Sequence, residues 1–410
     1  MPLSPESFPF SLDLLPRTAY MVGGAVRDAL LGRTREYLDL DFVLPSNAVK
    51  VARKIATHYK AGFVLLDPQR QIARVVFPHA TADFAQQEGD SLETDLHRRD
   101  FTVNAIAYSP YTQEIIDPLG GSADIERRIM RMVSATNLED DPLRLLRAYR
   151  QASQLGFSIE PDTQSAIRAL SSHITKVAAE RVRVELNYML ANSRGTPWLK
   201  IAWEDGLLAP FFKEATEESF TKLAAVDNAA LELTQAWQQL GKELGQYVRD
   251  TIKTTILGIA KLACLVSPDP QAAETQLQAL TYSRAEIKAV TTALRLFPQL
   301  KTFPLSLREQ YILFQEAGFV FPAIAVLAVA YGILVEAVAP LISRYLNPDD
   351  LVAHPITIVN GKELIIALKI PASPLVGKLL TEVAVAQLEG KISTPAQAIE
   401  FARHLLEGEN

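Results

Sequence analysis

The chain has little cysteine and no long uninterrupted apolar run. One cysteine, Cys264, among 410 residues excludes a disulfide framework and a cysteine-rich zinc site. The first fifteen residues lack a basic segment followed by an apolar one, so we expect no signal peptide. Residues 319–335 form the most apolar stretch, but Pro322 and Gly332 interrupt it and favour a buried helix over a membrane span. We therefore expect a cytoplasmic protein without membrane contact.

The chain also lacks a strong excess of charge, since its formal net charge is −6 at pH 7. This balance argues against general nucleic-acid binding but leaves room for a local basic site. Arginines gather within the first 150 residues, where they could hold a phosphate-rich partner. They are Arg98, Arg99, Arg127, Arg128, Arg131, Arg144, Arg147 and Arg150.

The hydrophobic pattern changes near residue 125. Before it, short β-branched and aromatic runs predict five strands and one longer helix. The strands lie at 20–22, 38–44, 63–66, 73–77 and 82–85, and the helix at 47–58. After residue 125, leucine and alanine recur at helical spacing, with breaks near 193–197, 267–270 and 347–350. We expect an α+β fold in which a small α/β head precedes a helical remainder.

Two aspartates alternate with apolar residues in the predicted strand 38–44. Asp39 and Asp41 therefore share one face of that strand. Neighbouring carboxylates repel, and a hard divalent cation such as Mg²⁺ resolves that conflict. Asp83 lies in a second alternating run and could supply a third carboxylate. The alternative for each of these aspartates is a solvated strand face.

Two glycines directly follow the first predicted strand. Gly23 and Gly24 would let the backbone approach a ligand closely. The segment 25–31 is typical of a short helix that ends at Gly32, and its free N–H groups could face a phosphate. Arg27 could add a charge-assisted contact to the same group.

A segment at residues 98–104 combines arginine with acidic and amide residues. Arg98, Arg99, Asp100 and Asn104 lie in or before an apolar segment, where arginine suits phosphate and Asp or Asn a ribose hydroxyl. The alternative is a capped helix with solvated arginines. Residues 117–125 are typical of a turn that leads into a helix.

A well-marked helix start follows at residues 140–150. Asp141 can cap this helix, Pro142 suits its first position, and Arg144 and Arg147 follow on the same side. An acceptor beside a donor fork matches the base edge of cytosine or adenine, whereas guanine and uracil present the reverse pattern. The alternative is a surface ion pair of little energetic value.

Together, these motifs resemble those of the bacterial class (class II) of the tRNA nucleotidyltransferase and poly(A) polymerase family, within the polymerase-β-like superfamily. The similarity covers about residues 20–190, with five motifs in the family's order. They are Gly-Gly-x-Val-Arg-Asp with Asp-x-Asp, Arg-Arg-Asp-Phe-Thr-x-Asn-Ala, Asp-Pro-Leu-Gly-Gly, Asp-Asp-Pro-Leu-Arg and Ala-Glu-Arg-Val-Arg. The resemblance implies a polymerase-β-like catalytic head at 1–125, a base-recognising neck at 126–195, a body at 196–345 and a tRNA-binding tail at 346–410, the last three all helical.

The resemblance also implies roles for single residues. Asp39 and Asp41 would hold two Mg²⁺ ions, with Asp83 as a third catalytic carboxylate. The nucleotide, CTP or ATP, would contact Gly23, Gly24, Arg27, Asp28, Arg99, Asp100, Asn104, Asp141, Arg144, Arg147 and Arg150. A tRNA 3′-hydroxyl would attack the α-phosphate and release pyrophosphate, while the tail grips the acceptor stem and elbow of the tRNA.

The segment between Asp83 and Arg99 bears on the product. Many CCA-adding members have a longer flexible loop there, whereas this chain has only residues 86–91. Members with such a short loop include CC-adding enzymes, so the resemblance favours CC addition over CCA or A addition. A poly(A) polymerase remains an alternative, as does a non-catalytic RNA-binding relative, although all three carboxylates are present. Asp140 stands where the family usually has Glu, and we expect little change from this.

Overall fold

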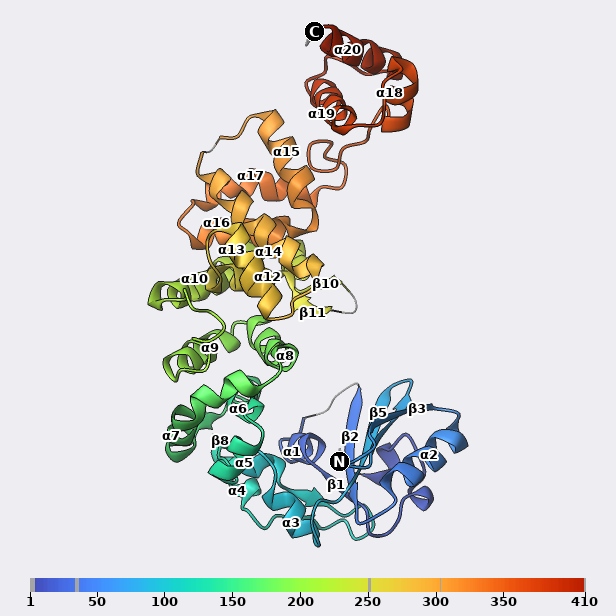
Figure 1. The fold of residues 1–410 in the computed structure, drawn as a ribbon, viewed down its shortest axis with the longest axis vertical. Helices are drawn as coiled ribbons and strands as arrows, with labels where there is room; N and C mark the ends of the chain where they lie inside the picture. The colour runs from blue at the N-terminus through green and yellow to red at the C-terminus, as the bar shows by residue number, and fades with distance from the viewer. Residues whose placement is uncertain (1–3, 34–36, 250–251, 303, 409–410) are drawn as a thin grey trace. The chain divides into compact units, whose positions relative to one another are not determined.

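The computed structural model describes residues 4–33, 37–249, 252–302 and 304–408. The chain divides into two compact units, each described here by itself (Figure 1). The first comprises Met1–Glu185 and Trp198–Leu208, and the second comprises Leu186–Pro197 and Ala209–Asn410.

The first unit is built on a mixed seven-stranded sheet in the order β3-β4-β5-β2-β1-β6-β7. Only β2 and β5 run parallel among the neighbouring strands of this sheet in the described residues. The strands are β1 (Tyr20–Val22), β2 (Leu38–Leu44), β3 (Gly62–Asp67), β4 (Ile72–Phe77), β5 (Ala80–Gln86), β6 (Ala107–Tyr108) and β7 (Ile115–Ile116). The five predicted strands are confirmed to within two residues, whereas β6 and β7 are too short to produce an alternating pattern.

Strand alternation divides this sheet into a buried face and an open face. Phe42 and Phe84 point to the buried face, where their rings stack with centroids 5.4 Å apart. Helix α2 (Ala48–Tyr59) covers the same face and packs on β4 and β5 (Figure 1). Burial of each phenylalanine ring stabilises the fold by about 1.5–3 kcal/mol. Asp41 and Asp83 alternate with these rings and therefore lie on the open face.

Short helices complete the first unit around this sheet. Helix α1 follows β1 directly, and Gly32 lies just beyond its end with a φ of +68°, which confirms the predicted helix end. The Asp117 carboxylate accepts hydrogen bonds from the N–H groups of Gly121 and Ser122 at 2.7 and 2.8 Å, so the predicted turn does lead into a helix. The helices are α1 (Gly24–Leu30), α3 (Leu92–His97), α4 (Gly121–Arg127), α5 (Ala135–Asp140), α6 (Leu143–Leu155), α7 (Pro161–Leu170), the first part of α8 (Ala179–Leu190) and most of α9 (Gly195–Glu204).

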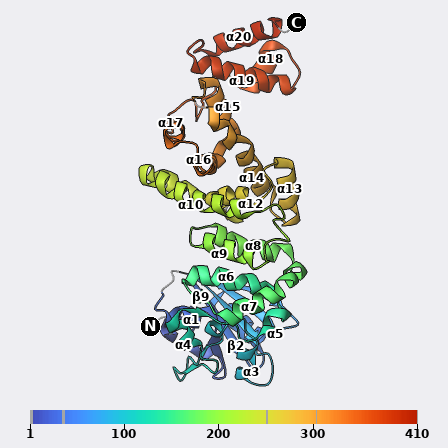
Figure 2. The same ribbon diagram turned by 90° about the vertical axis from the view of Figure 1, so that its left-hand side faces the viewer.

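The second unit is mostly helical (Figures 1 and 2). Its elements are α10 (Glu217–Ala236), α11 (Gln238–Leu244), β10 (Tyr247–Arg249), β11 (Ile252–Thr255), α12 (Ile256–Leu265), α13 (Pro270–Ala279), α14 (Arg284–Leu296), α15 (Leu307–Ala317), α16 (Phe321–Ala330), α17 (Val335–Leu346), α18 (Gly361–Leu368), α19 (Pro374–Leu388) and α20 (Pro395–Gly408). The predicted breaks at 267–270 and 347–350 are confirmed, whereas the break at 193–197 is shorter because α9 already begins at Gly195.

Two short sheets are exceptions to the helical remainder that the sequence predicts. In the first unit, β8 (Ile129–Met130) pairs in parallel with β9 (Ser158–Ile159). In the second unit, β10 and β11 form an antiparallel hairpin. Strands of two to four residues are too short to produce a clear strand pattern in a sequence.

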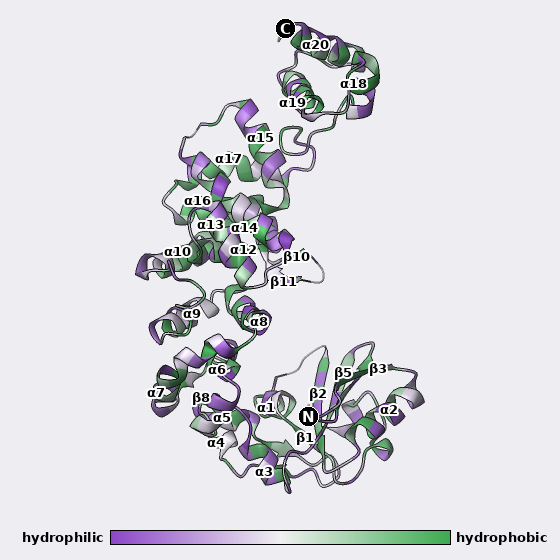
Figure 3. Cartoon of the chain, in the orientation of Figure 1, coloured by the Kyte–Doolittle hydropathy of each residue, from purple (hydrophilic) through white to green (hydrophobic). Residues whose placement is uncertain are grey.

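Helix α16 forms the apolar centre of the second unit and is composed entirely of apolar residues (Figure 3). Among the described residues, 307–330 is the one stretch long and apolar enough to cross a membrane, and 67% of its most apolar window is buried inside the protein. This burial is typical of a core helix, as the interruptions at Pro322 and Gly332 predict. A separate apolar cluster, which includes Leu364, Val383 and Ala402, holds α18, α19 and α20 together.

Candidate active site

The three predicted carboxylates meet on the open face of the sheet. Asp41 pairs in register with Asp83 across the parallel strands β2 and β5, and Asp39 precedes Asp41 by one step on the same face. Asp39 is exposed, and its Oδ1 accepts a 2.6 Å hydrogen bond from the Thr81 hydroxyl. The structure thus brings together the residues that strand alternation predicted to be neighbours.

The carboxyl group of Asp41 lies in an unfavourable environment for a charge. Burial, together with the nearby Asp39 and Asp83 carboxylates, raises the pKa of Asp41 from 3.8 to about 7. Arg99 and Arg74 oppose this increase without cancelling it. A cation would relieve the same repulsion more fully, because it would add positive charge directly between the carboxylates.

Gly23 makes room for this group. Its φ of +73° favours glycine, and a Cβ atom built on it would lie 3.3 Å from Asp41 Oδ2 and 3.4 Å from Arg99 Nη1. Gly23, between β1 and α1, therefore lets a carboxylate and a guanidinium approach the backbone closely. This close approach explains the first glycine of the Gly-Gly pair.

Arg74 is the member of the site that the sequence did not reveal. It pairs in register with Asp83 across β4 and β5, and its guanidinium grips both carboxylate oxygens. The Nε–Oδ1 distance is 2.7 Å and the Nη2–Oδ2 distance is 2.8 Å. The register of the β4–β5 hairpin decides this contact, and the two-residue turn between Phe77 and Ala80 is the sequence signal that could have predicted it.

The donor set fits Mg²⁺ through a pair of carboxylates rather than three. Asp39 and Asp41 offer oxygen ligands, which Mg²⁺ prefers, and Mg²⁺ commonly binds through one or two carboxylates plus water and phosphate oxygens. In the described part of the chain, no group of three or more Asp, Glu, His or Cys side chains is arranged to hold a metal ion. Both oxygens of the third carboxylate, Asp83, accept hydrogen bonds from Arg74.

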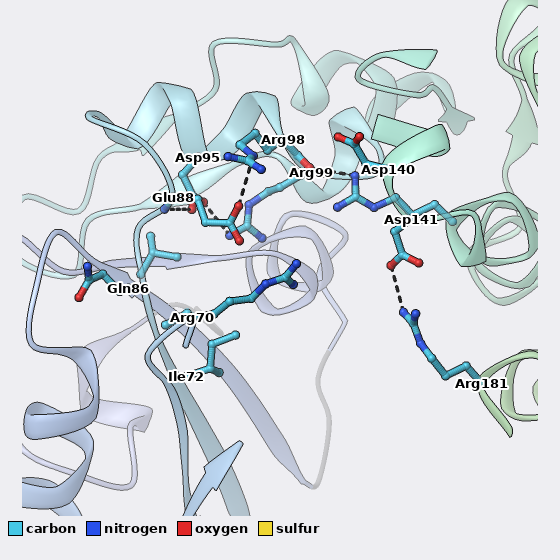
Figure 4. Close-up of a pocket in the computed structure, with 13 residues that line it drawn as sticks. Arg70, Ile72, Gln86, Glu88, Asp95, Arg98, Arg99, Asp140, Asp141 and Arg181 are labelled. Carbon is cyan, nitrogen blue, oxygen red and sulfur yellow. Dashed lines mark hydrogen bonds and ion pairs between the residues drawn. The ribbon is translucent and has the colours of Figure 1, made fainter. Parts of the chain in front are cut away.

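A cavity of about 520 Å³ adjoins the carboxylates along the same face (Figure 4). The register places Val43, Ile72 and Ala85 one step beyond the row of Asp41, Arg74 and Asp83. These residues form the apolar part of the cavity wall, and five arginines, four acidic residues and Gln86 form the rest. The full lining is Val43, Arg70, Ile72, Ala85, Gln86, Glu88, Asp95, Arg98, Arg99, Asp140, Asp141, Arg144 and Arg181.

Arg99 joins the carboxylates to this cavity. Its Nη2 donates a 3.1 Å hydrogen bond to Asp95 Oδ2 on α3, while its Nε is buried without a hydrogen-bond partner in the described residues. A buried donor without a partner is costly, so this nitrogen is suited to an acceptor on a ligand. The segment 98–101 is not helical, because α3 ends at His97.

A smaller cavity of about 250 Å³ has a wall of Arg99, Asp100, Asp141, Arg144, Arg147 and Arg181. Arg147 donates to Asp100 Oδ2 from Nε at 3.0 Å and from Nη2 at 2.8 Å. Burial alone would raise the pKa of Asp100, but the Arg147 guanidinium and a hydrogen bond from Asn104 outweigh it and hold the pKa at about 2. Asp100 is therefore a fixed anion that orients Arg147.

Arg27, Asp28 and Asn104 form a buried network behind this wall and line neither cavity. Arg27 pairs with Asp28 at 2.7 Å, and its Nη1 donates to Asn104 Oδ1 at 2.6 Å and to Gln151 Oε1 at 3.2 Å. Asn104 Nδ2 in turn donates to Asp100 Oδ1 at 2.9 Å. In this structure these residues support the cavity wall. Gln151 was missed, although it lies one helical turn after Arg147.

Asp141 and Arg144 both line the cavities, as the hypothesis of a base-reading pair requires. Helix α6 begins at Leu143, and the Asp141 carboxylate caps this start as predicted, because its Oδ1 accepts a 3.4 Å hydrogen bond from the Leu143 N–H. Its Oδ2 accepts a 3.0 Å hydrogen bond from Arg181 Nη2 (Figure 4). Arg144 Nη1 donates to the backbone carbonyls of Arg98 and Asn137 at 2.9 and 3.0 Å.

Arg150 lies elsewhere on α6 and lines neither cavity. It pairs with Glu185, and its Nη1 donates to Gln154 Oε1 at 2.8 Å. Its place near the nucleotide stays a prediction.

The link between β5 and α3 is short and well held. It comprises residues 87–91, and the backbone N–H of Glu88 donates to Asp95 Oδ1 at 3.0 Å. The Glu88 carboxylate lies 3.2 Å from Arg98 Nε (Figure 4). This link thus forms one fixed edge of the larger cavity.

Family models match most of the chain. The model described as the poly A polymerase head domain matches residues 19–131. One described as a probable RNA and SrmB-binding site of polymerase A matches 156–219, and one described as a putative tRNA nucleotidyltransferase domain 2 matches 250–402.

Relatives and solved structures agree with these matches. A CC-adding tRNA nucleotidyltransferase of Synechocystis is 48% identical over 98% of this chain and 96% of its own length. An A-adding tRNA nucleotidyltransferase of Deinococcus radiodurans is 30% identical over 96% of each chain. A Thermotoga maritima CCA-adding enzyme complexed with tRNA shares the fold, with a TM-score of 0.67, 20% identity and coverage of 95% of this chain and 91% of that one. The full-length similarity and the matched head domain show that this chain belongs to the family of tRNA nucleotidyltransferases and poly(A) polymerases.

Proposed function

We propose that this protein is a CC-adding tRNA nucleotidyltransferase, which transfers two cytidylate residues from CTP to the 3′ end of tRNA and releases pyrophosphate. The observation that carries this proposal is the carboxylate pair of Asp39 and Asp41 beside an arginine-rich cavity that contains Asp141 and Arg144. The 48% identity to a CC-adding relative over nearly the whole chain supports it.

The proposed roles follow from the position of each side chain. Asp39 and Asp41 hold Mg²⁺, which supplies positive charge for the phosphate oxygens and the attacking hydroxyl. Arg99 and Arg147 donate hydrogen bonds to phosphate or ribose oxygens, because both line the smaller cavity. Asp141 and Arg144 read the base edge, with an acceptor beside a donor fork.

The buried residues of the predicted nucleotide set act through others in this proposal. Arg27, Asp28 and Asn104 hold Asp100, and Asp100 orients Arg147. For the whole protein, the proposal is a cytoplasmic enzyme with a head, neck, body and tail. Its tail binds the acceptor stem and elbow of tRNA.

The short link after β5 supports a reaction that stops after the second cytidine. With Glu88 held by Asp95 and Arg98, this edge of the cavity has little freedom to reshape itself for a different base. A switch from cytosine to adenine would require such a change, because the two bases differ in size.

Three tRNA substrates test the proposal: one without any CCA residues, one that ends in C and one that ends in CC. With Mg²⁺ and CTP we expect the first to gain two nucleotides and the second to gain one, and with ATP we expect no extension of the third. Extension of the third with ATP would show a CCA-adding or A-adding enzyme instead. Products that grow past three adenylates on unstructured RNA would show a poly(A) polymerase.

Asp41→Ala tests the metal assignment in the same assay. We expect addition to be abolished while tRNA binding, measured by filter retention, stays near the wild-type value. Asp13→Ala, which removes an exposed carboxylate of the same unit, is the matched control and should leave addition unchanged. Activity of Asp41→Ala near the wild-type level would contradict the assignment.

A further inference from the structure

The Arg74–Asp83 pair is the strongest contact within the carboxylate cluster. Two parallel hydrogen bonds of 2.7 and 2.8 Å join the guanidinium and the carboxylate in a fork. The fork is partly shielded from solvent, since the Asp83 side chain is 17% exposed and that of Arg74 is 39% exposed. The hydrogen bond to Asp83 raises the pKa of Arg74, so the guanidinium stays charged at every relevant pH.

The fork determines which carboxylate oxygens can reach a cation. Asp83 Oδ1 and Oδ2 each accept a hydrogen bond from Arg74, whereas no described residue forks onto Asp39 or Asp41. A metal ligand must direct a lone pair at the ion, and the bidentate guanidinium takes one lone pair on each Asp83 oxygen and so fixes the orientation of the carboxylate. The register explains why the contact persists, because Arg74 and Asp83 are directly opposite across two paired strands.

We propose that Arg74 is a positioning residue that keeps Asp83 out of the metal shell, so that divalent cations bind through Asp39 and Asp41 alone. This inference rests on the proposed function only in taking Asp39 and Asp41 as the metal ligands. It also assigns Asp83 a different role: its charge, neutralised by Arg74, fixes the guanidinium beside Asp41.

The Arg74–Asp83 pair lowers the net negative charge of the carboxylate cluster. Three free carboxylates would bind cations tightly and repel the triphosphate of an incoming nucleotide. With Arg74 on Asp83, the cluster presents two negative charges instead of three, and the guanidinium attracts Asp39 and Asp41 as well. This arrangement lowers the affinity for the metal and also lowers the electrostatic repulsion of the anionic nucleotide.

Mn²⁺ binding to the full-length protein tests the inference without nucleotide or tRNA. The fraction of free Mn²⁺ is measured by electron paramagnetic resonance for wild type, Arg74→Gln, Asp83→Asn and Asp41→Asn. We expect Arg74→Gln to bind Mn²⁺ about fivefold more tightly, because Asp83 becomes free to ligate. Asp83→Asn should weaken binding by less than about threefold, and Asp41→Asn by about tenfold or more, since only the latter removes a ligand.

The double variant Arg74→Gln with Asp83→Asn provides the control. It should bind Mn²⁺ like Asp83→Asn alone, because removal of Arg74 strengthens binding only when Asp83 is present. It also retains no unpaired charge at this position, so it remains informative if either single variant folds poorly. Arg74→Lys should give an affinity between wild type and Arg74→Gln, because an ammonium group cannot form the fork.

Two results would overturn the inference: Asp83→Asn weakening Mn²⁺ binding as much as Asp41→Asn, or Arg74→Gln leaving it unchanged. Either would leave the proposed function intact. If Asp41→Asn did not weaken Mn²⁺ binding, the metal assignment itself would fail, so the two failures are distinguishable.

Discussion

Asp41→Asn should stabilise the protein while it abolishes the proposed activity. The pKa of Asp41 is about 7 in the folded chain, against 3.8 for an ordinary aspartate. A carboxylic acid whose pKa is raised by folding does not destabilise the folded state at pH values below its unfolded pKa. As the pH rises from about 4 to 7, this group increasingly lowers the free energy of unfolding. The stabilising effect of asparagine should therefore be absent near pH 4 and complete above pH 7.

The size of the effect follows from the same shift. A change of about 3 pKa units corresponds to an upper bound of about 4 kcal/mol at neutral pH. Solvent screens part of this repulsion, so we expect roughly 1–3 kcal/mol. For a unit of this size, such a gain raises the melting temperature by about 2–12 °C. At pH 5 the gain should be about a third of its full value.

Thermal unfolding followed by circular dichroism between pH 5 and pH 8.5, with EDTA present, measures this gain. Asp39→Asn is the matched control and should give a clearly smaller gain, because the Asp39 side chain is exposed. Addition of Mg²⁺ should raise the melting temperature of wild type more than that of Asp41→Asn. A gain that is equal at pH 5 and pH 8.5, or no gain at all, would refute the electrostatic account of the site.

Three further predictions concern residues of the first unit. Asp100→Asn should lower the free energy of unfolding by about 2 kcal/mol at pH 7, because a folded pKa of about 2 gives stability that is present above pH 4 and lost toward pH 2; urea unfolding at pH 7 and pH 3 checks this, and an equal loss at both would contradict it. Gly121→Ala should cost about 3 kcal/mol or more, because the new Cβ would lie 2.2 Å from the Thr102 carbonyl oxygen; a melting temperature like that of wild type would show that the helix start can shift. Arg144→Ala should reduce discrimination between CTP and UTP by about tenfold, measured by competitive incorporation, and unchanged discrimination would contradict its proposed role at the base edge.

Features that depend on residues close together in the chain could be predicted from the sequence. The alternation around Asp39 and Asp41 predicted β2 and its open face, because side chains alternate along any strand. The Gly-Gly pair predicted a close approach, and its physical reason is the Asp41 oxygen 3.3 Å from the position of a Gly23 Cβ. The order of the motifs predicted the family, which the full-length relatives confirm.

Tertiary structure alone decided which of these residues face a ligand and which support others. Strand register placed Asp83 beside Asp41, and no spacing along the chain determines the register between β2 and β5, because no turn joins these parallel strands. The position of α6 beside α1 and residues 100–104 brought Gln151 to Arg27, and Arg150 of the same helix pairs with Glu185. The sequence by itself thus determined the two carboxylates and the chemistry of the family, because both depend on local periodicity and motif order. The position of the third carboxylate beside Asp41 depends on the pairing of two strands that no turn joins, and only the folded chain could decide it.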